Sequence, residues 1–274
     1  QGKVAVFEDR QLPPVVGGAD DGEVGRADHE VLVREGVVEP VGEQFRQFEY
    51  KGINYNLFIP ENPRGEKLPL VYFLHDAGPC GDDPKLPLSQ GNGAITWARP
   101  DWQQKHPCFI LAPHCPDNKF WEQEDMKAAL KGLLDKILSE QKNADSSRVY
   151  IYGNSMGGIG TLAMLKEYPG FFSRALSICG ATDSKKLEAL TDVALTLVHA
   201  KDDRIVKPVR YFALTGQEFL GSIALYEELQ KMGKKDVHIQ IYEEGELMKK
   251  YGVNPHCSWY PALRNDALKE YFFG

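Results

Sequence analysis

Apolar residues follow two spacings along this chain, and together they predict a layered α/β protein. Around the turn Lys51-Gly52, apolar and polar residues alternate, which predicts an antiparallel β-hairpin over residues 45–59 with one buried face. The side chains expected on that face are Phe48, Tyr50, Ile53, Tyr55, Leu57 and Ile59. Continuous apolar runs, typical of strands buried on both faces, follow at 68–74, 108–112 and 149–152, and further strands are expected at 175–179, 193–198 and 237–242.

Helical spacing of apolar residues lies between these runs. It is clearest over residues 122–141, and a second helix is expected from the end of the 149–152 strand to about residue 168, where Pro169-Gly170 stops it. Further helices are expected near 217–232 and 262–272. This βα order predicts a mostly parallel central sheet flanked by helices, with the antiparallel hairpin on its leading edge.

The first 44 residues have a different character. They hold ten acidic and four basic residues, a net charge of −6, which leaves only −1 of the total −7 for the rest of the chain. They also contain Pro13-Pro14 and Gly17-Gly18 and little that could pair in a sheet. We therefore expect an acidic, irregular N-terminal arm over 1–44 and a single domain over 45–274.

Composition limits the function classes. The 274 residues are 42% hydrophobic and 26% charged, as in ordinary soluble domains, and no apolar run approaches the length of a membrane span. Because residues 45–274 are nearly neutral, we expect neither a nucleic-acid nor a membrane partner. The chain begins at Gln1 without a signal-peptide pattern, so secreted and cytoplasmic locations both stay open, as does the oligomeric state.

The five cysteines are too few and too scattered for a disulfide framework, and Cys108 and Cys179 lie in apolar runs as small core side chains. A cluster at 106–115 contains two histidines and two cysteines. Strand alternation places His106 and Cys108 on one face but separates His114 from Cys115. The sequence therefore predicts no metal and no organic cofactor.

Residues 153–157 read Gly-Asn-Ser-Met-Gly, between a predicted strand and a predicted helix. In that context G-x-S-x-G is typical of a nucleophile elbow, in which the serine occupies a strained, sharp turn. Gly153 and Gly157 are needed because a Cβ at either position would collide where strand and helix meet. Ser155 is the expected nucleophile, and the Met156 N–H at the helix N-terminus is an expected oxyanion donor.

A serine nucleophile needs a base and an acid from later strand ends. Two adjacent carboxylates, Asp202 and Asp203, follow the 193–198 strand, and either could supply the acid. His256 follows the last predicted strand and precedes the last helix, so it is the expected base. The second oxyanion donor is expected in the loop after residue 74, from Ala77, with Asp76 as the alternative.

These motifs resemble the α/β-hydrolases of the esterase and "predicted peptidase" group, which includes polyhydroxybutyrate-depolymerase-like and feruloyl-esterase-like proteins. The matching segments read LHDAG at 74–78, GNSMGG at 153–158, HAKDDRIV at 199–206 and HCSW at 256–259. The resemblance covers about 45–274 and implies the α/β-hydrolase fold. The family pattern H-G-x-x-D-x-x-V aligns its acid with Asp203. Asp76 and Ala200 stand where this family usually has glycine.

The resemblance favours a serine carboxylic-ester hydrolase that acts through an acyl-enzyme. Four tryptophans lie near loops that should surround the site, and Trp121 and Trp259 are the expected substrate contacts. Aromatic walls suit a small-molecule ester or an acetyl or feruloyl ester linked to a plant polysaccharide. Two alternatives stay open: a serine peptidase with the same triad, and a catalytically silent binding protein with a hydrolase fold.

Overall fold

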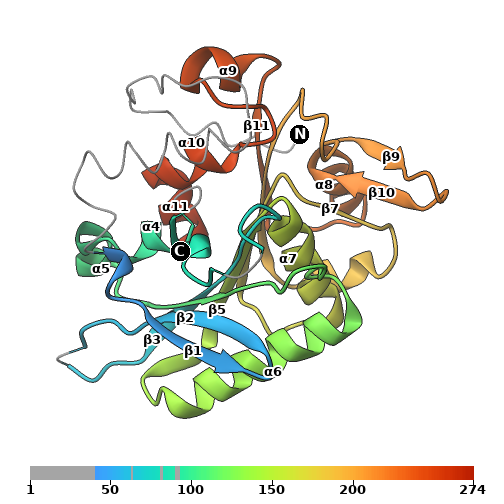
Figure 1. Ribbon diagram of the computed structural model, residues 1–274. Coiled ribbons are helices and arrows are strands. Elements are labelled where there is room, and N and C mark those ends of the chain that lie inside the picture. Colours follow the sequence, from blue (N-terminus) through green and yellow to red (C-terminus); the bar gives the residue numbers. More distant parts are fainter. Residues whose placement is uncertain (1–40, 63, 81–82, 90–92) are drawn as a thin grey trace.

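A central β-sheet organises the protein, seen nearly edge-on in Figure 1. The computed structural model describes residues 41–62, 64–80, 83–89 and 93–274. Within them the main sheet has eight strands in the order β1-β2-β4-β3-β5-β6-β8-β11. Their bounds are β1 Arg46–Tyr50, β2 Ile53–Phe58, β3 Leu68–Leu74, β4 Phe109–Pro113, β5 Ala144–Asn154, β6 Arg174–Ile178, β8 Ala194–Ala200 and β11 Val237–Tyr242.

The pairing pattern is the predicted one. β1 and β2 form the antiparallel hairpin at one edge, and β2 also pairs antiparallel with β4. From β4 to β11 every neighbouring pair is parallel, so the carboxyl ends of these strands all lie at one edge of the sheet. Loops at that edge are where an α/β sheet builds its site.

Helices cover both faces of the sheet (Figure 1). One face packs against α4 Ile95–Ala98, α5 Pro100–Lys105, α9 Glu246–Tyr251, α10 Trp259–Arg264 and α11 Asp266–Phe273. The other face packs against α6 Glu124–Glu140, α7 Met156–Glu167 and α8 Ser222–Lys231. Two hydrophobic cores result, and alternate residues of β3 enter them: Val71 and Phe73 enter one core, and Leu70, Tyr72 and Leu74 enter the other. Two short helical segments, α3 Leu86–Ser89 and the 3₁₀ helix Leu187–Leu190, complete the described helices.

The hairpin differs from its prediction in which side chains are buried. Phe48 was expected inside, yet it is 44% exposed because β1 is an edge strand whose residues face solvent. Asn56, which the alternation placed outside, is fully buried. Its amide donates to the Pro84 carbonyl at 2.7 Å, so a loop covers the second face of β2 there. Ile59, also expected inside, is 36% exposed just beyond the end of β2.

Two predicted helices have different bounds in the structure. Residues 218–221 belong to β10 (Glu218–Gly221), which pairs with β7 (Ala181–Thr182) and β9 (Arg210–Phe212) in a small second sheet; α8 starts only at residue 222. The region 262–272 divides into α10 and α11 at Asn265, whose side chain accepts from the Leu268 N–H at 3.2 Å and caps the second helix. Helix α9, which was not predicted, lies between β11 and His256.

Most of the predicted N-terminal arm, residues 1–40, lies outside the described residues. Its last four residues, 41–44, are described. Val41, in the last part of that arm, is 3% exposed and packs in the same core as Phe45. Among the helices that the structure describes, none is long and apolar enough to cross a membrane.

Candidate active site

The elbow lies between β5, which ends at Asn154, and α7, which begins at Met156. Ser155 has φ 51° and ψ −114°, a positive φ that a residue with a Cβ rarely adopts. The neighbouring backbone fixes this conformation: the Ser155 N–H donates to the Ile178 carbonyl at 2.9 Å, and the Ser155 carbonyl accepts from Ile159 N–H at 2.9 Å. The turn therefore holds the serine in the strained geometry predicted for a nucleophile.

Close backbone contacts explain the two glycines of the motif. A Cβ at Gly157 would overlap the Leu74 carbonyl oxygen, and a Cβ at Gly153 would overlap the Gly157 carbonyl group. The first turn of α7 therefore lies directly against the end of β3. The loop that follows β3 is consequently held beside Ser155.

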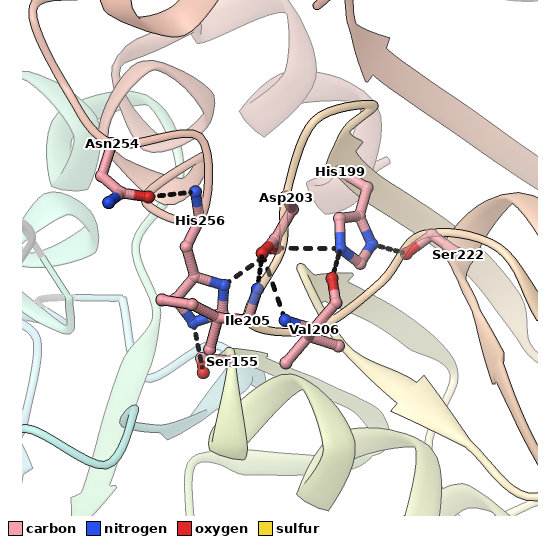
Figure 2. Close-up of polar contacts among 8 residues, drawn as sticks. All are labelled: Ser155, His199, Asp203, Ile205, Val206, Ser222, Asn254 and His256. Atoms are coloured by element: carbon pink, nitrogen blue, oxygen red, sulfur yellow. Dashed lines mark hydrogen bonds and ion pairs between the residues drawn. The ribbon is translucent and has the colours of Figure 1, made fainter. Parts of the chain in front are cut away.

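Figure 2 shows Ser155, His256 and Asp203 in one hydrogen-bonded chain. His256 Nε2 lies 2.8 Å from Ser155 Oγ, and His256 Nδ1 lies 2.8 Å from Asp203 Oδ2. Because a carboxylate only accepts, Nδ1 carries the proton, which leaves Nε2 to accept from the serine hydroxyl. The Asn254 side chain accepts from the His256 N–H at 2.9 Å and orients the loop. The structure thus brings together the three residues selected from the sequence.

Asp203 is held by four donors. Its Oδ1 accepts from the N–H groups of Ile205 (2.9 Å) and Val206 (3.1 Å), and its Oδ2 accepts from His256 and from His199 Nε2 at 3.1 Å. Burial raises the pKa of this carboxyl, but the hydrogen bonds from the two histidines outweigh burial and lower it to about 2. Asp203 is therefore ionised throughout the neutral range.

His199 is a site residue that the sequence reasoning missed. Its Nε2 also lies 2.8 Å from the Val206 carbonyl, so with two acceptors facing it this nitrogen must be the protonated one. Its Nδ1 then accepts from the Ser222 hydroxyl at 2.8 Å. The signal was present in the sequence, because His199 and Val206 are the first and last positions of the motif that aligned Asp203.

Asp202 has a different place. Its Oδ2 accepts from the Gly245 N–H at 2.9 Å, which ties the β8 loop to the turn before α9. The two adjacent carboxylates therefore have separate partners, and only Asp203 reaches the imidazole of His256.

The loop from His75 to Cys80, here called the oxyanion loop, follows β3. The side chain of His75 is fully buried: its Nδ1 donates to the Asp76 carbonyl at 2.5 Å, and its Nε2 accepts from the Cys115 N–H at 2.9 Å. The His75 carbonyl accepts from the Trp121 indole at 2.8 Å. Burial lowers the pKa of His75 to about 3, so the ring is neutral and serves to position the loop.

The two expected oxyanion donors are the N–H groups of Met156 and Ala77. Met156 is the first residue of α7, and Ala77 lies in the oxyanion loop. In the part of the chain that the structure describes, neither N–H has a hydrogen-bond acceptor. Asp76 lies between His75 and Ala77 and is 8% exposed. Burial raises the pKa of Asp76 to about 6, and its charge interacts with His256, so a second ionisable carboxyl lies at the site.

The two tryptophans expected to contact substrate occupy different places. Trp121 is fully buried behind the oxyanion loop, edge-on to the His75 ring at a centroid distance of 5.1 Å, so it supports the loop instead of lining a pocket. Trp259 is 4% exposed and lies edge-on to the His256 ring at 5.5 Å. Its buried indole N–H has no hydrogen-bond partner among the described residues.

One group of possible metal ligands lies close together among the described residues. It consists of Cys179, Asp203 and His256, with ligand atoms within 4.8 Å of one another. The carboxylate and the imidazole already bond to each other, and burial raises the pKa of the Cys179 thiol. A thiol that keeps its proton is a poor ligand, so the serine-histidine-aspartate arrangement accounts for this group.

Replacing Trp121 by Phe tests which role the indole has. Trp121→Phe removes the donor to the His75 carbonyl, so we expect kcat to fall roughly tenfold and stability by ~1–2 kcal/mol, since a buried acceptor loses its partner. KM should stay within about twofold for every substrate. A change in KM that depends on the acyl group would instead place the ring in the pocket.

Buried His75 also predicts a pH effect on stability. Its pKa of about 3 in the folded protein lies below the ordinary 6.5, so the unfolded chain binds the proton first. The stabilisation is present above pH 6.5 and is lost as the pH falls towards 3. We expect the titration of His75 to make the free energy of unfolding about 2 kcal/mol smaller at pH 5 than at pH 8. Asp203 adds a further loss below about pH 4, as its own lowered pKa is approached.

Denaturant unfolding of the wild type and of His75→Gln at both pH values measures this effect. Glutamine keeps an acceptor for the Cys115 N–H but does not titrate, so the variant should lose less stability on acidification. Equal losses in the two proteins would show that His75 is not the group responsible.

Several known proteins are similar to this chain. Residues 116–212 match the prolyl oligopeptidase family. A solved structure titled a thermostable esterase is 36% identical, with a TM-score of 0.76, over 85% of this chain and 63% of that chain. No match was found among the curated proteins.

Two more distant structures share the fold. A ferulic acid esterase is 12% identical, with a TM-score of 0.58, over 83% of this chain and 96% of its own. An acylaminoacyl peptidase of Pyrococcus horikoshii is 17% identical, with a TM-score of 0.59, over 92% of this chain and 44% of its own. This chain therefore spans less than two thirds of the thermostable esterase and less than half of the peptidase. By its sheet, its elbow and these similarities, the chain has the α/β-hydrolase fold.

Proposed function

We propose that this protein is a serine carboxylic-ester hydrolase in which Ser155, His256 and Asp203 are the catalytic residues. The observation that carries the proposal is the pair of 2.8 Å contacts from Ser155 Oγ to His256 and from His256 to Asp203, on a strained elbow. A serine hydroxyl is a weak nucleophile until a positioned base removes its proton. This arrangement supplies that base in the required tautomer.

In the proposed reaction, Ser155 Oγ attacks the ester carbonyl while His256 Nε2 takes the hydroxyl proton. The imidazolium then gives this proton to the leaving alkoxide, and an acyl-enzyme remains. Water, deprotonated by His256, hydrolyses the acyl-enzyme and restores the serine. Asp203, ionised and held by four donors, stabilises the imidazolium in both halves.

The oxyanion of each tetrahedral intermediate needs preorganised donors. The Met156 N–H at the start of α7 and the Ala77 N–H in the oxyanion loop are the proposed pair, and both lack other acceptors within the described residues. Each such donor contributes roughly 3 kcal/mol to the transition state. The loop's anchors at His75 and Trp121 set the position of Ala77.

The proposed substrate is a small-molecule ester or an acetyl or feruloyl ester linked to a polysaccharide. Similarity to a thermostable esterase at 36% identity supports the ester, and the fold shared with a ferulic acid esterase is compatible with an aromatic acyl group. Trp259 is the proposed substrate contact, because its ring packs beside His256 and its indole N–H is unpartnered within the described residues.

We further propose residues 45–274 as one catalytic domain with residues 1–44 as an arm.

A serine peptidase is the second candidate, favoured by the match to the prolyl oligopeptidase family. The same three residues would serve both reactions. An amide differs in its leaving group, since the amine must receive its proton before it departs, whereas an alkoxide leaves more easily. The distinction is therefore one of relative rates on esters and amides.

A substrate panel tests the proposal. It contains p-nitrophenyl acetate and butyrate, methyl ferulate, acetylated xylan and a peptide anilide, with Ser155→Ala as the matched control. We expect ester turnover that disappears in the control, with little anilide cleavage. Anilide cleavage without an ester preference would favour the peptidase. Absence of turnover together with absence of labelling by a fluorophosphonate probe would indicate a silent binding protein.

A further inference from the structure

Two cysteines connect the oxyanion loop to the segment that follows β4. Pro79 and Cys80 end the loop, and His114 and Cys115 begin the segment. The His114 Nε2 donates to the Pro79 carbonyl at 2.6 Å. Each cysteine is therefore the chain neighbour of one partner in this hydrogen bond, and the side chains of the two cysteines also hydrogen-bond to each other.

The packing separates this pair from the other cysteines. Cys115 is fully buried and Cys80 is partly buried, and both pack in the core that includes α6. Cys108, Cys179 and Cys257 lie in the core on the opposite face of the sheet. Among the described residues, none of the five cysteines is in a disulfide. A disulfide on the α6 side can therefore form between Cys80 and Cys115 without competition from the other three.

The two thiols of the pair are chemically unequal. They interact directly, and this contact lowers the pKa of the Cys80 thiol and raises that of Cys115. Cys80 is also the more accessible of the two. The lower pKa and the greater accessibility of Cys80 favour this sulfur as the one that reacts first, with the buried Cys115 as the sulfur that resolves the product.

We propose that Cys80 and Cys115 form an oxidative modification site that reacts with small-molecule disulfides and closes a reversible disulfide bond between the oxyanion loop and the segment after β4. The contact between Pro79 and His114 and the shared burial of the two side chains carry this proposal.

The reaction has two exchange steps. The Cys80 thiolate attacks one sulfur of oxidised glutathione, breaks its S–S bond and releases one glutathione thiolate, which leaves a mixed disulfide on Cys80. The Cys115 sulfur then attacks the Cys80 sulfur, its proton passes to the second departing glutathione thiolate, and the internal disulfide forms. The protein loses two electrons and two hydrogens, which one glutathione disulfide takes up as two thiols.

The cross-link restricts the loop that carries Ala77. It also closes the chain between residues 80 and 115 in the unfolded state, which lowers the entropy of that state. We expect the thermal midpoint to rise by roughly 5 °C in the oxidised protein. Dithiothreitol should reverse the rise.

The test treats the reduced full-length protein with oxidised glutathione and maps its peptides by mass. The expected product is one peptide pair joined through Cys80 and Cys115, lighter by two hydrogen atoms than the reduced pair. Cys115→Ser should stop at the glutathione adduct on Cys80, and Cys80→Ser should form neither product. Cys108→Ser is the matched control and should react as the wild type does.

Three results would overturn the proposal: a stable glutathione adduct on wild-type Cys80 without the internal disulfide, a linkage to a different cysteine, or no reaction. The wild-type peptide map and Cys80→Ser suffice to decide if Cys115→Ser does not fold. All of these readouts are independent of ester hydrolysis, so failure of the proposed function would leave the test valid.

Discussion

Ser155→Gly is expected to lose turnover by about a million-fold and yet to be more stable than Ser155→Ala by ~1 kcal/mol. Both changes remove the nucleophile and the 2.8 Å contact with His256 equally. They differ only in the Cβ, and the backbone at residue 155 has φ 51°. Glycine adopts a positive φ without steric cost, whereas alanine retains the strain.

The informative result is which of the two variants has the larger free energy of unfolding. At ordinary positions glycine is less stable than alanine, because it loses more backbone entropy on folding. Denaturant unfolding of the two inactive proteins at pH 8 compares them directly. If the alanine variant is equally or more stable, the elbow holds no strain and the turn needs another explanation.

The parallel part of the sheet was predictable because its inner strands are buried on both faces, so apolar runs mark them; the edge strand β11 is only partly buried, yet its apolar residues still indicate a strand. β11 matches the expected range residue for residue, and β3 does so as well. The small sheet of β7, β9 and β10 was not predicted. Its strands are short, and the exposed Phe212 in β9 gives no buried-face pattern to detect.

Within the site, sequence motifs identified the residues whose roles are set by their immediate neighbours in the chain. The elbow around Ser155 is such a case, because strand, turn and helix are all local. Roles that depend on packing were missed or misplaced. His199 lies in the same motif as Asp203, but its bond to Asp203 depends on Ser222 and the Val206 carbonyl, which fix its ring. Trp121 lies behind the oxyanion loop, a position that no spacing along the chain specifies.

Asp203→Asn is expected to lower kcat by about 10⁴-fold, whereas Asp202→Asn should change it by no more than about threefold. Asp203 Oδ1 accepts two backbone N–H groups, which hold the acceptor oxygen of an asparagine in that place. The asparagine NH₂ then faces His256 Nδ1 and His199 Nε2, the two nitrogens that donate to Asp203 Oδ2 in the wild type. His256 must move its proton from Nδ1 to Nε2, and an Nε2–H cannot accept the proton of Ser155.

Asp202→Asn is the matched control, since it makes the same change of charge one residue away. Its amide oxygen can still accept from the Gly245 N–H, so the β8 loop keeps its anchor. Steady-state kinetics on p-nitrophenyl butyrate, with circular dichroism to check folding, compares the two. Full activity in Asp203→Asn, or a large loss in Asp202→Asn instead, would transfer the role of the acid to Asp202. A loss of similar size in both would mean that net charge, and not the tautomer of His256, limits the reaction.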